Sequence, residues 1–456
     1  MLRLFRSGLK LQQEACFCQS AVQRGAIILG IETSCDDTGA AVVDGKNGRV
    51  LGEYVHSQKL NHIRFGGILP PLAIKWHAQH IDDVIQRALA QSQLSLADVD
   101  AIAVTNMPGL ASCLEIGVSK ALDLCRQSGT PLIPIHHMQA HALTVRLVQP
   151  ELQFPFLCLL VSGGHCILVW IEEVDSFKIL GQTIDTAPGE ALDKISRRLK
   201  LYHLGGEYER MSGGQAIEVM ARTGDPFAYT FPVPMRKHKN CNFSFSGLKT
   251  KIMWQIERLE ADFGIKGGSR IPNTPDFCAS VQMAFFRHFA KRLQRGIEFL
   301  ETQGYLSDKD VPKNFVLSGG VACNEFFRHN LSRLVAHYGF SSHYPPPELC
   351  TDNGVMIAWN GVERWRANAP GILRQIPDSI PVEPIAPIGP DLSAEIAKLD
   401  FSIHKRISTT KLVQEGMVEE KSSSDGHSSD DEIELSDSEY YKRKRDKELF
   451  SEETLS

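Results

Sequence analysis

The 456-residue sequence predicts an α/β protein with two or more domains or subdomains. Short apolar stretches alternate with stretches of helical period over most of its length, which is the pattern of α/β folds. Three of the apolar stretches, at 27–31, 156–161 and 315–317, run into turns of small and polar residues. Glycine lets backbone N–H groups approach a ligand closely, and clustered N–H groups stabilise phosphate oxygens. The repeated strand–turn unit therefore indicates a nucleotide site.

The three turns lead into different elements. The first, at 32–39, and the second, at 162–165, each precede another apolar strand. The third, Ser318-Gly319-Gly320, precedes a helix-like stretch from Ala322. A single glycine turn would carry little weight, because hairpins need glycine in any case. Three such units spread along the chain are harder to attribute to hairpin chemistry.

The other elements are predicted from apolar periodicity and from the glycines and prolines that interrupt it. We expect helices at 77–91, 118–125 and 354–366, strands at 101–104 and 131–135, a Gly-, Pro- and Asn-rich loop at 264–275, and a proline-rich stretch from 370 to 390.

Composition bounds the class of protein. A hydrophobic content of 43% supports sizeable cores, and no apolar run is long enough to cross a bilayer, so we expect no membrane span. The 11 cysteines form no CxxC pair, which favours reduced thiols over a disulfide framework. Residues 415–456 hold 6 basic and 14 acidic residues, and residues 1–25 hold 4 basic and 1 acidic residue. The body between them is neutral, which allows only a local basic patch for RNA.

Both ends differ in composition from this body. Residues 1–26 are nearly free of acids and place three basic residues at helical spacing, which predicts a mitochondrial transit peptide; a frayed terminus is the alternative. Residues 401–456 become rich in Ser, Asp and Glu and should be disordered, because they bury too little apolar surface to offset their ordering entropy. The basic cluster at 442–445 is either a nuclear localisation signal or part of a solvated tail.

One pair of histidines has the spacing of metal ligands. His137 and His141 lie on one face of an expected helix, so both imidazoles can reach one ion. HxxxH alone is a weak signal, and packing or surface histidines are the alternative. Asp352 offers a carboxylate, but it sits where a helix N-cap would fall, so capping is its alternative role. Two histidines and one carboxylate would leave open positions on Zn, Fe or Mg for a substrate oxygen.

For several other polar residues this reasoning leaves two roles open. Asp193 belongs to a group of carboxylates around a helix start, where it complements the macrodipole or binds a ribose. The basic run 236–239 either contacts RNA phosphates or forms a solvated loop. Cys35 is a nucleophile or a small buried residue, and we favour the second because no base is evident beside it. His77 and His80 fit core or surface positions better than a metal site. There is no P-loop and no GxGxxG fingerprint.

Taken together, these stretches resemble the tRNA threonylcarbamoyltransferase family, once called sialoglycoprotein endopeptidases, and in particular its mitochondrial-type branch. The resemblance covers about Ile27 to Pro390, and its most specific pieces are, in order, GIETSCDDT, HHMQAH, LVSGGH, GEALDK, NFSFSGLK, LSGGVACN and CTDNGVMIAWNG. It implies the actin-like ATPase (ASKHA) fold, in which two α/β subdomains face each other across a nucleotide cleft. We therefore expect subdomains at 27–150 and 151–400, with a terminal helix of the second returning to the first.

The resemblance also implies roles for single residues. His137, His141 and Asp352 would be the ligands of one divalent metal ion per subunit, and Asp36 and Asp37 would be the catalytic acidic pair. The residues expected to contact the acyl-adenylate are Leu160, Val161, Ser162, Gly163, Gly164, Asp193, Gly214, Glu218 and Asn324.

The implied reaction transfers the threonylcarbamoyl group from threonylcarbamoyl-AMP to N6 of the adenosine just 3′ of the anticodon, in mitochondrial tRNAs that read codons beginning with A. The implied setting is a homodimer in the mitochondrial matrix, supplied with its donor by a separate threonylcarbamoyl-AMP synthase. An exocyclic adenine amine is a poor nucleophile, so positioning should matter more than strong base catalysis.

Three departures from the family pattern bear on this interpretation. Met107 replaces a usual glycine before Pro108, and Asp185-Thr186 replaces an acidic pair. An extra segment at 202–211 makes Gly206 a competitor of Gly214, which we prefer because Glu218 follows it at the family's spacing. The alternatives are an ATPase or kinase of the same fold and a non-catalytic scaffold for nucleotide or RNA. The old family name suggests a metalloprotease, but this sequence has no HExxH motif, which disfavours that function.

Overall fold

The computed structural model describes residues 25–65, 67–399 and 406–424. It divides into a first unit that runs to Thr409 and a second that begins at Thr410. The predicted transit peptide, apart from residues 25 and 26, and the basic cluster at 442–445 lie outside the described residues. No helix among the described residues is long and apolar enough to span a membrane.

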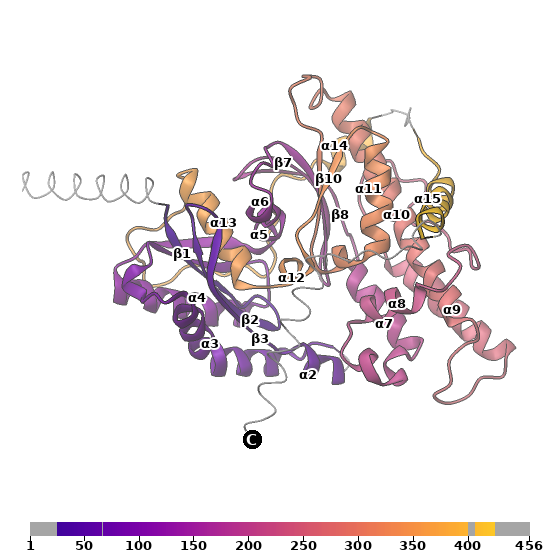
Figure 1. Cartoon of the computed structure of the whole chain (residues 1–456), viewed down its shortest axis with the longest axis horizontal. Coiled ribbons are helices and arrows are strands. Elements are labelled where there is room, and N and C mark those ends of the chain that lie inside the picture. Colours follow the sequence, from indigo (N-terminus) through magenta and orange to yellow (C-terminus); the bar gives the residue numbers. More distant parts are fainter. Residues whose placement is uncertain (1–24, 66, 400–405, 425–456) are drawn as a thin grey trace, which may run out of the picture. The chain divides into compact units, whose positions relative to one another are not determined.

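The first sheet has five strands in the order β3-β2-β1-β4-β5 (Figure 1). β1 pairs with β2 antiparallel and with β4 parallel, so the sheet is mixed. Its central strand is buried apart from its first residue, because helices cover both faces. The strands are β1 (Ile27–Glu32), β2 (Asp37–Asp44), β3 (Arg49–Ser57), β4 (Ala101–Met107) and β5 (Leu132–His136).

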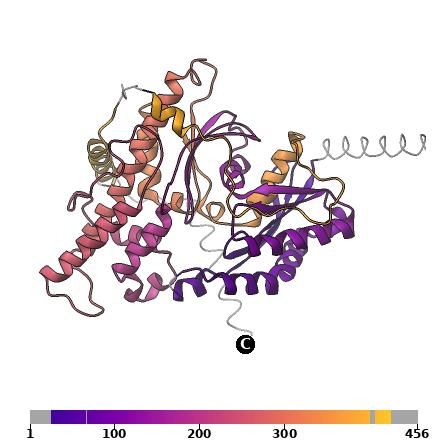
Figure 2. The ribbon, with the colours of Figure 1, turned by 180° about the vertical axis from the view of Figure 1, so that it is seen from behind.

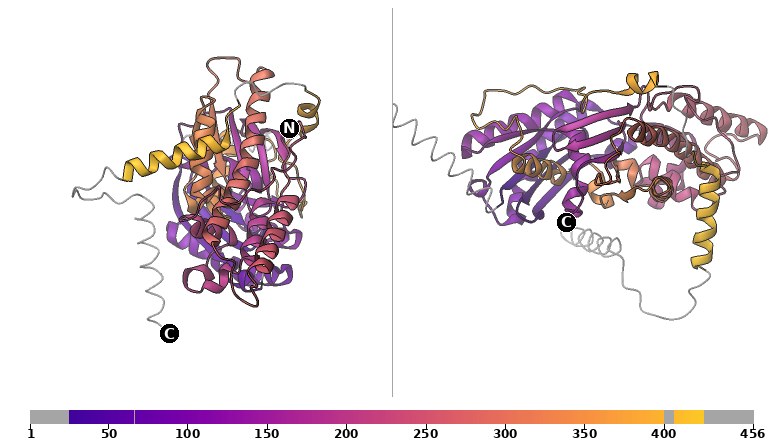
Figure 3. Two further views of the ribbon diagram at one scale, coloured as in Figure 1. Left: turned by 90° about the vertical axis from the view of Figure 1, so that its right-hand side faces the viewer. Right: turned by 90° about the horizontal axis from the view of Figure 1, so that it is seen from above.

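The second sheet repeats this topology. Its order is β10-β9-β6-β7-β8, and its central strand β6 pairs antiparallel with β7 and parallel with β9. The strands are β6 (Phe156–Val161), β7 (Cys166–Glu173), β8 (Ser176–Gln182), β9 (Asn314–Ser318) and β10 (Ser341–His343). Seen from above, the strands of the two sheets form separate groups (Figure 3). The α/β class and the two-sheet actin-like architecture are therefore confirmed.

Helices join and cover these sheets. α3 (Pro70–Ser92) and α4 (Ala111–Ser128) pack on one face of the first sheet, and α10 (Thr274–Thr302) packs against the second, where Gly296 approaches Leu168. Among the described residues, the other α-helices of the first unit are α2 (Lys59–Arg64), α5 (His137–Leu143), α6 (Val145–Val148), α7 (Pro188–Arg198), α8 (Gly213–Ala221), α9 (Ser246–Asp262), α11 (Glu325–Ala336), α12 (Pro347–Cys350), α13 (Gly354–Arg366) and α14 (Ser393–Lys398). The short 3-10 helices are η1 (Leu96–Asp98), η2 (Leu201–Leu204), η3 (Gly206–Glu209) and η4 (Gly320–Cys323).

α13 comes late in the chain but packs on the first sheet, on the face opposite α3 and α4 (Figures 1 and 2). The approach is close, since a Cβ added at Gly30 would lie 2.3 Å from the backbone nitrogen of Ala358. Glycine is required here because any side chain would collide with the α13 backbone. The sequence expectation of a helix at 354–366 is confirmed with the same bounds.

The second unit differs from expectation. Residues 401–456 were expected to be disordered, but Thr409–Ser424 form the helix α15. The prediction averaged over a Ser- and acid-rich tail, whereas this stretch begins with residues of better helix propensity, among them Leu412, Gln414 and Glu415. Residues 406–408 form no helix or strand, and the rest of the predicted tail lies outside the described residues.

Candidate functional site

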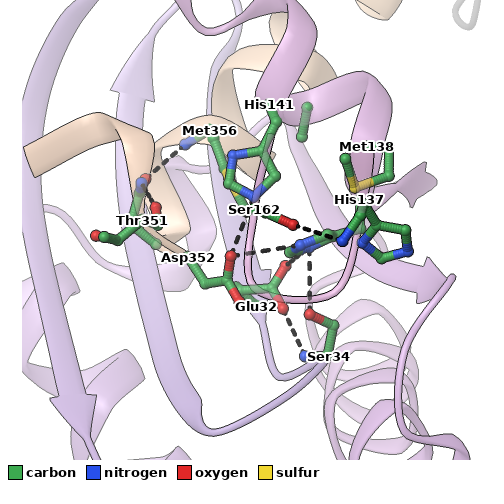
Figure 4. Close-up of polar contacts among 12 residues, drawn as sticks. Glu32, Ser34, His137, Met138, His141, Ser162, Thr351, Asp352 and Met356 are labelled. Atoms are coloured by element: carbon green, nitrogen blue, oxygen red, sulfur yellow. Dashed lines mark hydrogen bonds and ion pairs between the residues drawn. The ribbon is translucent and has the colours of Figure 1, made fainter. Parts of the chain in front are cut away.

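α5 is the element that places the two histidines. It starts directly after β5, and its apolar residues divide between the cores of the two sheets: Ala140 packs with the first core and Met138 with the second. The carbonyl of His141 also accepts a hydrogen bond from the Ser318 hydroxyl at the end of β9, at 2.7 Å. The helix is thus fixed between both sheets, and its remaining face presents His137 and His141 (Figure 4).

His137, His141 and Asp352 converge on one point. Nε2 of His141 lies 3.0 Å from Oδ1 of Asp352, and Nε2 of His137 lies 3.4 Å from the same oxygen. One ligand atom from each residue falls within 4.8 Å of the others, and both histidines are buried. Burial alone would raise the pKa of Asp352, but the two imidazoles outweigh it and hold that pKa well below its ordinary value. The structure therefore brings the three candidate ligands together.

The capping alternative for Asp352 is wrong. The N-cap of α13 is Asn353, whose side-chain oxygen accepts from the backbone N–H of Met356 at 2.9 Å. Two adjacent residues each have a polar side chain able to cap, and the structure assigns that role to the second. The carboxylate of Asp352 is left to face the histidines.

Glu32 orients His137 from the other side. Its Oε2 lies 3.1 Å from Nδ1 of His137 and accepts from the Thr105 hydroxyl at 2.6 Å, while Oε1 accepts from the backbone of Ser34. Burial lowers the pKa of His137, but Asp352 and Glu32 outweigh it and raise that pKa to about 10. With Nδ1 bound to Glu32, Nε2 is the nitrogen turned toward Asp352.

This donor set fits a divalent metal ion. Two imidazole nitrogens and a carboxylate oxygen are within reach of one ion, and a carboxylate behind the first imidazole is the usual partner of a metal-bound histidine. Nδ1 of the buried His141 has no hydrogen-bond partner among the described residues. The three residues thus form a candidate His–His–Asp metal site.

Asp36 and Asp37 lie in the first turn, next to this cluster. Burial and the Asp352 carboxylate raise the pKa of Asp36. Burial and Asp36 raise the pKa of Asp37 to about 7, against opposing contributions from Ser57 and Lys59. Oδ1 of Asp37 is buried without a hydrogen-bond partner among the described residues. A carboxyl group with such a pKa can exchange a proton near neutrality.

The second turn is open and has free donors. The carbonyls of Ser162 and Gly163 are bound by the backbone N–H groups of Gly189 and Glu190 at the start of α7. No hydrogen bond among the described residues uses the N–H of Gly163 or Gly164, and a Cβ at either glycine would meet nothing within 4 Å. Leu160 and Val161 are buried strand residues. The turn can therefore offer two N–H groups to an anionic ligand.

The other predicted substrate contacts gather around α8. Asp193 of α7 accepts from the backbone N–H groups of Gly213 and Gly214, at the start of α8. Glu218 accepts from the backbone of Glu325 at 2.7 Å. Asn324 caps α11 through Phe327. Gly206 lies in η3 and has no part in this contact, so the geometry is consistent with the choice of Gly214.

Three residues for which the sequence analysis favoured no role in the site have structural roles. His77 bonds the Thr38 hydroxyl at 2.7 Å and the carbonyl of Cys35 at 3.1 Å, as a satisfied core histidine does. Burial, followed by Asp36, raises the pKa of the Cys35 thiol well above its ordinary value, which disfavours a nucleophilic thiolate. Asp185 accepts from the backbone of Phe245 and the hydroxyl of Ser244, so it holds the turn before α9.

The basic run 236–239 is an exposed loop. Arg292 of α10 holds it from inside by donating to the carbonyls of Met235, His238 and Asn240, at 2.6–3.1 Å. The loop thus has a fixed backbone and presents its basic side chains outward, which fits a contact with RNA phosphates as well as a solvated loop.

Sequence reasoning missed two residues of this site. Glu32 went unassigned, although a carboxylate ending an otherwise apolar strand is a signal of a buried partner. His165 was quoted only as the end of a turn; burial, followed by His137 and His141, lowers its pKa to about 4, so it lies near the cluster as a neutral imidazole.

Comparisons with known proteins agree with this geometry. Residues 49–359 match the family model of TsaD, tRNA N6-adenosine threonylcarbamoyltransferase. The chain is 45% identical to the mitochondrial tRNA N6-adenosine threonylcarbamoyltransferase of Danio rerio over 85% of this chain and 94% of that protein. It is 45% identical to the protein of the same name from Homo sapiens over 83% of this chain and 89% of that protein. A tRNA N6-adenosine threonylcarbamoyltransferase of Ruegeria pomeroyi is 40% identical over 75% of this chain and 90% of its own length. The chain belongs to the tRNA N6-adenosine threonylcarbamoyltransferase family.

Proposed function

We propose that this protein transfers the threonylcarbamoyl group of threonylcarbamoyl-AMP to N6 of the adenosine 3′ of the anticodon, in mitochondrial tRNAs that read codons beginning with A. The carrying observation is the His137–His141–Asp352 cluster at the junction of two sheets, in a chain of this family. In the reaction a bond forms between N6 and the carbamoyl carbon. The bond from that carbon to the phosphate oxygen breaks, and AMP leaves.

His137, His141 and Asp352 would hold one divalent ion per subunit, which is Zn, Fe or Mg. When bound, the ion supplies positive charge that holds a phosphate or carbonyl oxygen of the donor and offsets charge developing on it. Glu32 keeps His137 in the orientation that this requires.

The second turn and α8 would hold the nucleotide. The free N–H groups of Gly163 and Gly164 suit phosphoryl or carbonyl oxygens, and Asp193 and Glu218 suit the hydroxyl groups of a ribose. Asn324 and the backbone of residues 160–162 complete this set. Fixing the donor in this way lowers the entropic cost of transfer to a weak nucleophile.

Asp36 or Asp37 would orient the adenine amine and accept its proton. Asp37 fits this role because its pKa of about 7 lets it take up a proton at neutral pH and release it again. Its unpartnered, buried Oδ1 is a free acceptor within the first turn.

The reaction also defines the partners. The substrates would be threonylcarbamoyl-AMP, made by a separate synthase, and mitochondrial tRNA, with the loop 236–239 as one contact for its phosphates. The names of the relatives from Danio rerio and Homo sapiens support a mitochondrial location. We place the protein in the matrix, as a homodimer.

The test is direct transfer with purified components. Metal-loaded protein is incubated with threonylcarbamoyl-AMP and unmodified tRNA, and digested nucleosides are analysed by mass spectrometry. We expect threonylcarbamoyladenosine with the unaltered protein and with the exposed control Asp378→Asn, and none with Asp352→Ala. Absence of product with folded protein and intact donor would overturn the proposal.

A further inference from the structure

Lys59 reaches from the first half of the protein into the second. It is the first residue of α2, which follows β3 of the first sheet after Gln58. Its ammonium group lies 3.4 Å from Oε1 of Gln215, the residue after Gly214 in α8. This contact places the start of α2 against α8. None of the roles assigned above involves this side chain beyond its effect on the pKa of Asp37.

The ammonium group lies among groups that carry or can carry negative charge. Its positive charge partly offsets the rise in the pKa of Asp37 and the rise in the pKa of Asp193. It also helps to lower the pKa of the Cys323 thiol, beside the candidate contact Asn324. These three groups come from the first turn, from α7 and from η4. From its contact at the start of α8, the charge of Lys59 therefore acts on groups of the first turn, of α7 and of η4.

No single group neutralises this cation. Lys59 forms no ion pair within 4.0 Å with any described residue, and its one side-chain hydrogen bond is a long contact to a neutral amide. The residue as a whole is half-buried, while its contact with Gln215 is open to solvent and so to a ligand. A lysine ammonium has three donors, and two of them have no partner among the described residues. A cation that acts on nearby acidic groups without forming an ion pair is available to an anionic ligand.

We propose that Lys59 binds the phosphate of the acyl-adenylate. This inference rests on the proposed function. When the carbon–oxygen bond to the phosphate breaks, the electron pair stays on the phosphate oxygen, and the N6 proton passes to the acidic pair. The leaving AMP thus carries more negative charge than the bound donor. A cation at the phosphate stabilises the leaving group more than it stabilises the substrate.

The experiment compares AMP with adenosine as calorimetric ligands of the metal-loaded protein, because the two differ only by the phosphate. The variants are Lys59→Gln, Lys59→Arg and the exposed control Lys75→Gln of α3. We expect Lys59→Gln to weaken AMP binding by about 10-fold or more and to leave adenosine binding unchanged. Lys59→Arg should retain most of the AMP affinity, and Lys75→Gln should match the unaltered protein.

Three results would overturn the inference, and a fourth would overturn only the proposed function. Equal loss of AMP and adenosine affinity in Lys59→Gln would indicate a structural role. Unchanged AMP affinity with weaker tRNA binding would assign the cation to RNA phosphates instead. If the unaltered protein binds AMP and responds to Lys59→Gln as expected but makes no threonylcarbamoyladenosine, only the proposed function fails. If it binds no AMP, both fail.

Discussion

Oε2 of Glu32 and Nδ1 of His137 lie 3.1 Å apart, and both side chains are buried. The contact joins the end of β1 to the start of α5, so the first strand of the first sheet sets the orientation of an imidazole at the candidate metal site. In the metal-bound state the carboxylate would keep the remaining proton on Nδ1 and leave Nε2 to bind the ion.

Glu32→Gln should therefore weaken metal binding while keeping the shape of the site. The amide preserves volume but removes the charge that supports His137, and we expect metal affinity to fall by roughly 10–100-fold. Titration of the metal-free protein with Zn²⁺ measures this. Glu173→Gln, at the exposed end of β7, is the control. Equal affinities for the Glu32→Gln variant and the unaltered protein would mean that Glu32 has only a packing role.

Removal of a metal ligand should abolish the increase in the free energy of unfolding that metal binding causes. For the unaltered protein, a divalent ion at 100 times its Kd should add about 2.7 kcal/mol to the free energy of unfolding, because it binds only the folded state. His141→Ala should show little or no such increase, whereas the exposed His203→Ala should behave normally. Thermal melting with and without chelator measures the effect, and full stabilisation of His141→Ala by metal would contradict the ligand assignment.

Asp37 should make stability fall with rising pH. Burial and Asp36 raise its pKa from 3.8 to about 7, so between these values the folded protein keeps a proton that the unfolded chain has lost. The free energy of unfolding contributed by this group therefore decreases as pH rises through that window. Asp37→Asn removes the dependence, and we expect it to stabilise the protein by about 4 kcal/mol at pH 8 and hardly at all at pH 4.

The same variant should lose activity. Without a proton acceptor at this position, transfer should slow by roughly 10²–10⁴-fold. Denaturant unfolding at both pH values and single-turnover transfer give the two readouts, with the exposed Asp378→Asn as control. A variant that transfers at the normal rate would remove Asp37 from the mechanism, even if its stability changes as expected.

Two glycines in equivalent turns should respond oppositely to alanine. Gly319 has a φ of +98°, and an added Cβ would lie 2.6 Å from the carbonyl oxygen of Val161, so Gly319→Ala should destabilise by about 2–4 kcal/mol. Gly163 has open space, so Gly163→Ala should change stability by about 0.5 kcal/mol or less and weaken AMP binding by roughly 10-fold. Unfolding and calorimetry measure both. Normal AMP binding by Gly163→Ala would argue that the turn does not hold the nucleotide.

The sequence was informative where a local pattern determines geometry. The i, i+4 spacing places His137 and His141 on one helical face, and the alternating apolar runs placed β1, β6 and β9 correctly. The sequence analysis did not recognise that β4 and its Pro108-Gly109 turn are equivalent to β9 and its turn in the second sheet. In each turn a glycine packs closely on the backbone of another segment, Gly109 on Ser34 and Gly319 on Val161. That equivalence depends on sheet order, which a local pattern does not encode.

Long-range contacts explain what was missed. Whether Asp352 or Asn353 caps α13 is decided by histidines more than two hundred residues earlier, since His141 and Asp352 are 211 residues apart. The role of Lys59 depends in the same way on Gln215, which lies 156 residues later. Propensity and spacing describe neighbours in the chain, whereas these assignments depend on neighbours in space.

The return of α13 to the first sheet has a consequence for how the protein is made. Arg366 at its end bonds the carbonyl of Gly45, 321 residues earlier, so one face of the first sheet stays uncovered until almost the whole folded unit has left the ribosome. Contacts of such sequence separation form late and slowly. Asp352 immediately precedes α13, so the docking step that completes the first core also delivers the last metal ligand. Metal capture would thus mark the end of folding, and truncated chains would be unable to retain the ion.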